Sequence, residues 1–185
     1  DDKKSFSKIK FSVSNETTLQ RAQTLFTKEP ITIQWIRSFK KDSIFFDIGA
    51  NVGVYTLFAA IVSETQVFAF EPESSNYYTL MENIILNNLI DKISAYPIGL
   101  SNKTEFTSLF LNCFSKGGSH HMIGKSLDHN LKIRSTRFKQ GIFSTTLDDL
   151  ILKWKFPMPN YLKIDVDGIE FKIIEKSKTL LRNNN

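Results

Sequence analysis

Apolar residues recur along the chain with two alternating periods, one typical of strands and one typical of helices. Short apolar runs that predict buried strands are each followed by a longer stretch with apolar residues at helical spacing. The expected strands are 43–48, 66–70 and 93–98, and the expected helices are 16–28, 30–40, 52–63 and 74–89. This alternation predicts an α/β fold with a doubly wound, mostly parallel sheet and helices on both faces.

The pattern changes between residues 101 and 145. Two hairpin-like pieces, at 105–111 and 137–144, flank a polar loop that contains two glycines and two histidines. A helix from Thr146, a strand at 161–164 and a last helix then resume the α/β alternation.

These boundaries predict two parts of unequal size. Residues 1–42 are expected to form an N-terminal helical segment, and residues 43–185 one domain with a hairpin and loop insertion at about 101–145. The strand at 161–164 would lie toward the middle of a doubly wound sheet and leave a long unpaired edge. We therefore expect the fold to be truncated at the C-terminus of this sequence, so that the last strands of the sheet are missing.

The stretch FFDIGANVGVYT, from Phe45 to Thr56, joins the first strand to a helix through glycines. Its pattern, D-x-G-x-N-x-G, differs from the G-x-G-x-x-G of dinucleotide-binding loops. The glycines would let backbone N–H groups approach a ligand, with a helix N-terminus directly behind them. A carboxylate leading such a loop suits a ligand with an ammonium group better than a pyrophosphate. The loop therefore predicts a site for S-adenosylmethionine.

Six residues are candidates for holding this cofactor. Asp47 would accept from the methionine ammonium, directly or through water, because a carboxylate at the end of a strand faces the cofactor crevice. Glu71 follows the loop by roughly twenty residues, where an acidic side chain can bond both ribose hydroxyls. The others are Gly49 and Gly53, which would admit the cofactor, Asn51, which would hold the loop, and Gly99, expected near the adenine. An ordinary turn or surface role is the alternative for each.

Five motifs follow one another in order: FDIGANVGVYT, FAFEPE, PIGLSN, TLDDL and LKIDVDGIEFKIIE. From about residue 29 to the C-terminus, this set resembles the FkbM-type methyltransferases. The resemblance implies a Rossmann-like class I S-adenosylmethionine-dependent fold and O-methylation of a hydroxyl on a sugar or natural product. Two residues depart from the usual motifs: Asp42 stands where Gly is usual, and Asp167 where Glu is usual.

Methyl transfer to a hydroxyl requires that acceptor, methyl group and sulfur be aligned and that a base accept a proton. The catalytic candidates after the strand at 161–164 are Asp165, Asp167 and Glu170. A divalent metal held by these acids is an alternative that we do not favour. Asp167 and Glu170 have a further alternative, capping the last helix. His120, or its neighbour His121, could serve as a base from the loop insertion.

Charge and cysteine content narrow the expected setting. The net charge is +5, but lysines and arginines are scattered, so we do not expect a nucleic-acid partner. Cys113 is alone, and neither a signal peptide nor an apolar run of about 20 residues is evident in this sequence. We expect a cytoplasmic protein with a small-molecule or carbohydrate acceptor, and the sequence leaves the oligomeric state open.

Three other function classes remain open. A dehydrogenase would need the dinucleotide loop, which is replaced here. A non-catalytic methyltransferase-like module within a larger protein is compatible with a truncated sheet. A nucleic-acid methyltransferase is less compatible, because the fourth-strand motif reads I-D-V-D-G in place of the N/D-P-P-Y type of amino-methylating enzymes.

Overall fold

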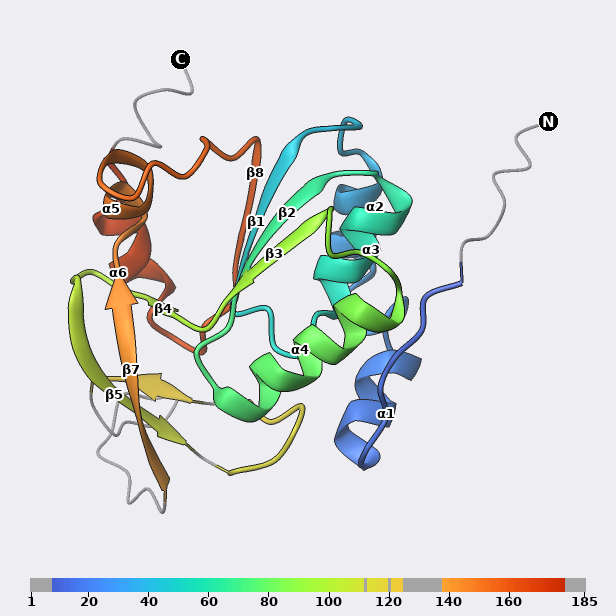
Figure 1. Cartoon of the computed structure of the whole chain (residues 1–185), viewed down its shortest axis with the longest axis horizontal. Helices are drawn as coiled ribbons and strands as arrows, with labels where there is room; N and C mark the ends of the chain where they lie inside the picture. Colours follow the sequence, from blue (N-terminus) through green and yellow to red (C-terminus); the bar gives the residue numbers. More distant parts are fainter. Residues whose placement is uncertain (1–7, 112, 120, 125–137, 179–185) are drawn as a thin grey trace.

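The computed structural model describes residues 8–111, 113–119, 121–124 and 138–178. Its centre is a four-stranded sheet in the order β3–β2–β1–β8, with every neighbouring pair parallel (Figure 1). The strands are β1 (Ile44–Ile48), β2 (Gln66–Phe70), β3 (Ile93–Tyr96) and β8 (Tyr161–Ile164). This order confirms the predicted α/β class, and it puts the carboxyl end of β1 between those of β2 and β8.

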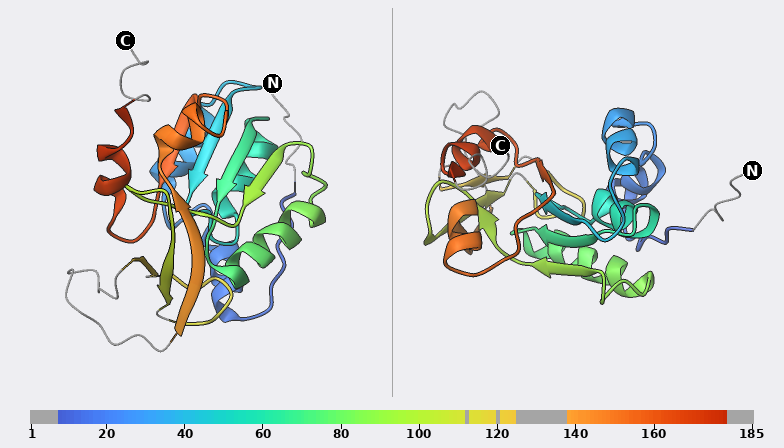
Figure 2. Two further views of the ribbon diagram at one scale, coloured as in Figure 1. Left: turned by 60° about the vertical axis from the view of Figure 1, so that its left-hand side comes forward. Right: turned by 90° about the horizontal axis from the view of Figure 1, so that it is seen from above.

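Helices cover both faces of this sheet (Figure 2). The helices that do so are α2 (Pro30–Arg37), α3 (Val54–Val62), α4 (Ser74–Leu86), α5 (Leu147–Leu152) and α6 (Glu170–Glu175), and α1 (Glu16–Gln23) precedes them. Successive strand residues point to opposite faces, so fully buried Phe45 packs with α2, α3 and α4, whereas fully buried Phe46 packs with α5 and α6. The helix α2 shares a hydrophobic core with α3 of the sheet domain. The predicted boundary between an N-terminal segment and the domain, at residue 42, stays a prediction.

A second sheet occupies the predicted insertion. Its order is β4–β7–β5–β6, and its strands are β4 (Gly99–Leu100), β5 (Glu105–Leu111), β6 (Met122–Ile123) and β7 (Phe138–Thr145). The long antiparallel pair of β5 and β7 corresponds to the two hairpin-like pieces. The strand predicted at 93–98 is shorter than expected, because the chain leaves the first sheet at Tyr96 and pairs Gly99 in parallel with β7.

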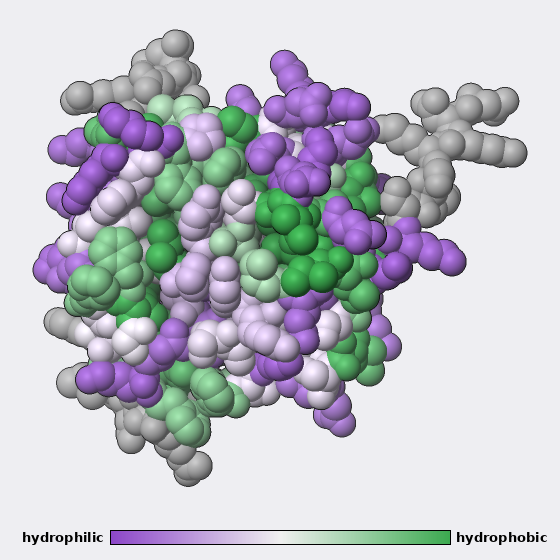
Figure 3. Space-filling view, viewed as in Figure 1, coloured by the Kyte–Doolittle hydropathy of each residue, from purple (hydrophilic) through white to green (hydrophobic). Residues whose placement is uncertain are grey.

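The surface mixes polar and apolar side chains, with an apolar area between polar ones on the right of the view in Figure 3. Ile85 and Ile90, at and after the end of α4, are 56% and 65% exposed. In the part of the chain that the structure describes, no helix has the length and apolar character needed to cross a membrane.

Candidate active site

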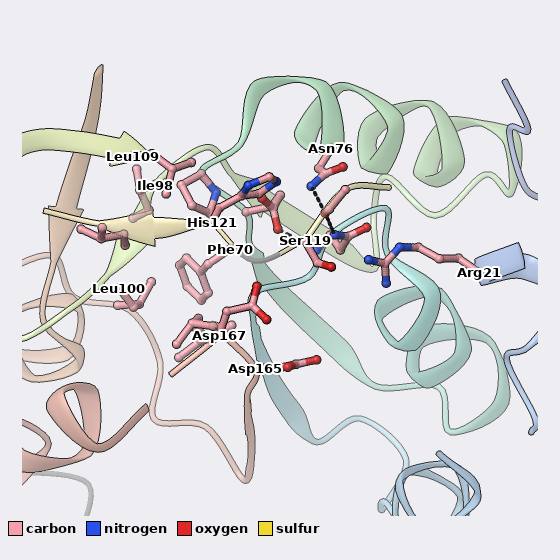
Figure 4. A pocket seen from close by; sticks show the side chains of 18 of the residues that line it. Arg21, Phe70, Asn76, Ile98, Leu100, Leu109, Ser119, His121, Asp165 and Asp167 are labelled. Carbon is pink, nitrogen blue, oxygen red and sulfur yellow. Dashed lines mark hydrogen bonds between the residues drawn. The ribbon is translucent and has the colours of Figure 1, made fainter. Parts of the chain in front are cut away.

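A cavity of about 370 Å³ opens at the carboxyl ends of β1, β2 and β8. One end is apolar, and Ile98, Leu100 and Leu109 lie together there on the left of Figure 4. The other end is polar, with Arg21 on the right of that view, Ser119 near its centre and the two aspartates below. The polar lining residues include Arg21, Asn51, Glu71, Asn76, Ser119, Asp165 and Asp167. The cavity therefore suits a ligand that is apolar at one end and charged at the other.

Glu71 is a buried acid in the wall of this cavity, with 5% of its surface exposed. Its two carboxylate oxygens accept hydrogen bonds from the backbone N–H groups of Asn51 (2.7 Å) and Glu73 (2.9 Å). Burial raises the pKa of Glu71 to about 7, although these two hydrogen bonds act in the opposite direction. The amides fix the carboxylate and leave lone pairs on both oxygens that can accept from ligand hydroxyls.

Asn51 lies in the β1–α3 loop, and its expected part in cofactor binding stays a prediction. It lies in the left-handed region with φ at 52°, and its Nδ2 donates to the carbonyl oxygen of Gly118 at 2.7 Å. Its backbone N–H donates to the carboxylate of Glu71, which follows β2. Asn51 therefore connects Glu71 to the loop of the insertion.

The two loop glycines have positive φ, which L side chains rarely adopt, and Gly49 is also approached closely by backbone. Gly49, with φ at 78°, has no room for a Cβ because the backbone carbonyl of Asp165 occupies that space. A Cβ on Gly53, with φ at 88°, would collide with Leu80 of α4. Gly49 also lines the cavity, whereas Gly53 is not among the lining residues. Their expected role in admitting the cofactor stays a prediction, and positive φ is a sufficient reason for both glycines.

Asp47 is buried beneath the cavity and is not among its lining residues. It accepts a hydrogen bond from Thr56 Oγ1 at 2.6 Å, and its other oxygen lies 3.6 Å from Lys163 Nζ. Lys163 also pairs with Asp165, at 3.1 Å. Burial by itself would lower the pKa of Lys163, but the two aspartates outweigh it and raise that pKa. Lys163 thus couples Asp47 to the cavity through Asp165, and the contact of Asp47 with a ligand ammonium stays a prediction.

The acids that follow β8 divide into two groups. Asp165 and Asp167 line the cavity, and the side chain of Asp165 is 54% exposed. Glu170 is not a lining residue, and its carboxylate accepts from the backbone N–H groups of Val166 and Gly168 in the turn before α6. The structure brings the two aspartates together at the site and gives Glu170 a role in the turn; a catalytic role for each stays a prediction. No cluster suited to a metal ion occurs among the described residues.

The histidine loop contributes to the cavity through His121, which lines it. His120 lies outside the described residues. Gly99 is not a lining residue, because the space beside its Cα is filled by Ile123, but its neighbours Ile98 and Leu100 form part of the apolar end.

Arg21 is a site residue that the sequence did not indicate. It extends from α1 toward the polar end of the cavity (Figure 4), and its Nε donates to the carbonyl oxygen of Gly117 at 2.6 Å. Burial lowers its pKa, whereas the carboxylates of Asp165 and Glu71 act in the opposite direction. A single arginine in a helix before the first strand carries no motif, so only the folded chain shows that it reaches the site.

The sequence profile of the Methyltransferase FkbM domain matches residues 47–184 of this chain. The chain belongs to the FkbM methyltransferase family. The match confirms the resemblance inferred from the five motifs, and with the parallel sheet it confirms a Rossmann-like class I methyltransferase fold.

Two curated relatives and one solved structure give the range of similarity. Hexuronic acid methyltransferase AglP of Haloferax volcanii is 22% identical over 176 residues, which cover 95% of this chain and 67% of AglP. Methyltransferase 1 of Beauveria bassiana is 24% identical over 152 residues, covering 75% of this chain and 60% of that protein. The crystal structure of P. horikoshii TYW2 in complex with MeSAdo has a TM-score of 0.34 at 24% identity and covers 50% of this chain and 33% of TYW2. This chain thus spans about two thirds of the length of its curated relatives.

Within this FkbM chain, one departure from the usual motifs has a local explanation. Asp42, where the resemblance implies Gly, has φ at 59°, in the left-handed region that glycine adopts without strain. Asp also tolerates that region better than most residues, so the turn before β1 survives the change.

Proposed function

We propose that this chain is an S-adenosylmethionine-dependent O-methyltransferase that acts on a hydroxyl of a sugar or of another hydroxylated small molecule. The observation that carries the proposal is the single cavity joining buried Glu71, the β1–α3 loop and the aspartates after β8. In open α/β sheets, ligands bind at the carboxyl ends of the strands, where this cavity lies.

The lining residues fit the parts of the cofactor. Ile98, Leu100 and Leu109 offer an apolar end suited to the adenine, and the fixed carboxylate of Glu71 suits the ribose hydroxyls. The polar end near Gly49 and Asn51 is left for the amino-acid part. When bound, the cofactor supplies an electrophilic methyl group on a sulfonium.

Asp165 is the residue that we assign to the acceptor hydroxyl. Its carboxylate lines the cavity, is half exposed and is oriented by a hydrogen bond from Lys163. A carboxylate so placed can align a hydroxyl and take its proton as the oxygen is methylated. Asp167, on the same turn, is the alternative base, and His121 lies across the same cavity.

A carbohydrate acceptor is supported by one relative, AglP, whose name describes a hexuronic acid methyltransferase. The polar end of the cavity, with its arginine and aspartates, is compatible with a hydroxyl-rich acceptor. Methylation of a sugar hydroxyl is therefore the reaction that we propose first.

The test is transfer of an isotopically labelled methyl group from S-adenosylmethionine to a panel of glycans that contain neutral sugars or hexuronic acids. The expected result is label on a hydroxyl oxygen, located by NMR of the product, together with calorimetric binding of S-adenosylhomocysteine. NAD serves as the control ligand and is expected not to bind. Binding of S-adenosylhomocysteine without transfer to any acceptor would favour a non-catalytic module, and failure to bind would contradict the cofactor assignment.

A further inference from the structure

Loop 115–119, the part of the insertion that reaches the cavity, is held by side chains from distant elements. Asn15, just before α1, donates through Nδ2 to the carbonyl oxygen of Lys116 at 3.0 Å and to Ser115 Oγ at 3.2 Å. Arg21 donates to the next carbonyl oxygen, that of Gly117. The first helix and the insertion therefore form one wall of the site, although α1 lies outside the residues matched by the family profile.

The other side of this loop is held by residues of the sheet domain. Asn51 and Asn76 both donate through Nδ2 to the carbonyl oxygen of Gly118, at 2.7 and 3.1 Å. Asn76 Oδ1 also accepts from the backbone N–H of Gly117 at 2.7 Å. Consequently the carbonyl that receives Arg21 Nε has a defined position relative to the cavity.

The guanidinium of Arg21 has only part of its donor capacity in use. Its Nε is occupied by Gly117, and the side chain points toward the cavity (Figure 4). The residue forms no ion pair within the described part of the chain, and Asp165, the acid with the strongest influence on it, pairs with Lys163 instead. The two terminal NH₂ groups of such a fork match the two oxygens of a carboxylate.

The amino-acid end of S-adenosylmethionine carries both an ammonium and a carboxylate. Asp167, a second carboxylate at the polar end of the cavity, can accept from the ammonium, because Asp165 is assigned to the acceptor hydroxyl. A carboxylate needs a cation, and among the described residues that line the cavity the lysine and arginine side chains are those of Arg21 and Lys28. Lys28 is exposed and lies 3.9 Å from Glu29, whereas Arg21 is half-buried and fixed by its Nε. Arg21 is the better placed of the two.

We propose that Arg21 of α1 binds the carboxylate of the amino-acid end of the cofactor and that loop 115–119 holds its guanidinium in position. This inference rests on the proposed function, because it assigns a binding residue for the same cofactor. It also gives α1 a role in the site, so that the cofactor is bound jointly by the sheet domain, the insertion and the N-terminal segment.

The test compares two ligands that differ by one carboxylate. S-Adenosylhomocysteine carries the complete amino-acid end, and 5′-(3-aminopropylthio)-5′-deoxyadenosine keeps the ammonium but lacks the carboxylate. Calorimetry with Arg21→Gln should show a loss of roughly tenfold to a hundredfold in affinity for the first ligand, the range for a hydrogen-bonded ion pair. The affinity for the second ligand should change by less than about twofold, because it has no group for Arg21 to bind. Arg21→Lys, which keeps the charge but not the fork, should be intermediate.

Arg37→Gln is the matched control, because Arg37 is an exposed arginine of α2 whose guanidinium lies over Phe58, away from the cavity. It should leave both affinities unchanged. An equal loss for both ligands in Arg21→Gln would overturn the proposal, because the residue would then act only by holding the loop. Unchanged affinity for both ligands would also overturn it. Arg21 would then be a candidate for binding an acidic methyl acceptor. If wild-type protein bound neither ligand, the proposed function itself would fail.

Discussion

The β1–α3 loop and loop 115–119 meet at the same cavity but are held in different ways. The first is fixed by backbone contacts with neighbouring strands: the N–H groups of Gly49 and Ala50 both donate to the carbonyl oxygen of Phe70, at 2.9 and 3.1 Å. Loop 115–119 is held largely by side-chain amides and a guanidinium from four positions in other elements. One side of this site is therefore built by the backbone of the sheet and the other by individual side chains. Substitutions should therefore have severe effects in the β1–α3 loop and graded effects among the side chains that hold loop 115–119.

The largest effect is expected from Gly49→Ala. Its Cβ would meet the carbonyl of Asp165 at a backbone conformation that L side chains rarely adopt, so the variant should lose more than about 3 kcal/mol of unfolding free energy and all cofactor binding. Chemical denaturation and calorimetry with S-adenosylhomocysteine measure the two losses. Two control variants separate backbone strain from steric collision. Gly168 has positive φ but open space around a Cβ, so Gly168→Ala shows the effect of strain alone. Gly141 has open space and no positive φ, so Gly141→Ala should have neither effect. A stable Gly49→Ala protein would show that the carbonyl of Asp165, just after β8, does not fix this loop.

Asp165→Asn tests the chemical role of the turn after β8. If Asp165 takes the acceptor proton, turnover should fall by roughly a hundredfold or more while the protein stays folded. Asp91→Asn is the control, since Asp91 is exposed and precedes β3. Full turnover in Asp165→Asn with a loss in His121→Ala or His120→Ala would place the base in the insertion.

Glu71→Gln should weaken the binding of S-adenosylhomocysteine by roughly 1 to 3 kcal/mol, the range for losing a charged hydrogen-bond acceptor. Ribose hydroxyls prefer the ionised carboxylate, and the pKa of Glu71 in the free protein is about 7. Wild-type affinity should therefore fall as the pH drops below 7, by up to about tenfold per unit, and level off above it. The charged groups with an influence on this carboxylate are Glu73, Asp47 and Arg21, and His121 lines the same cavity.

Calorimetry between pH 5.5 and 8.5 checks this dependence. Glu71→Gln should flatten the profile if Glu71 causes it, whereas a profile that persists in the variant would assign it to His121 or another group. Glu105→Gln, an exposed acid of β5, is the matched control and should change neither affinity nor profile.

The difference between the two loops also explains which features could be predicted from sequence. The parallel strands, the loop after β1 and the acids after β8 follow from local apolar periods and turn residues. The strands β2 and β8 have the expected bounds, β1 begins one residue later, and β3 ends at Tyr96 in place of residue 98. The contact of Arg21 with Gly117 joins residues 96 positions apart, and no local period or motif encodes it. Lys163 carried a weak signal, since it is a lysine inside an apolar strand, but its pairing with Asp47 depends on two strands lying side by side.

The smallest effect is expected from Asn15→Ser. Asn15 has two functions: its Oδ1 caps α1 by accepting from Thr18 N at 2.8 Å, and its Nδ2 holds loop 115–119. Serine keeps a capping oxygen but loses the donors to the loop, so α1 should remain while the loop becomes less well held. Affinity for S-adenosylhomocysteine should then fall by roughly twofold to fivefold. This loss is smaller than that for removing a hydrogen bond to a charged group, because Asn15 does not contact the cofactor itself.

Asn87→Ser is the matched control for this substitution. Asn87 Nδ2 also ties an N-terminal residue, Lys10, to α4, but it does not contact loop 115–119. It should lower the melting temperature slightly and leave the affinity unchanged. If Asn15→Ser and Asn87→Ser affected stability alike and affinity not at all, the position of loop 115–119 would not depend on α1. The cofactor site would then be built by the sheet domain, with the side-chain contacts serving only to pack the first helix.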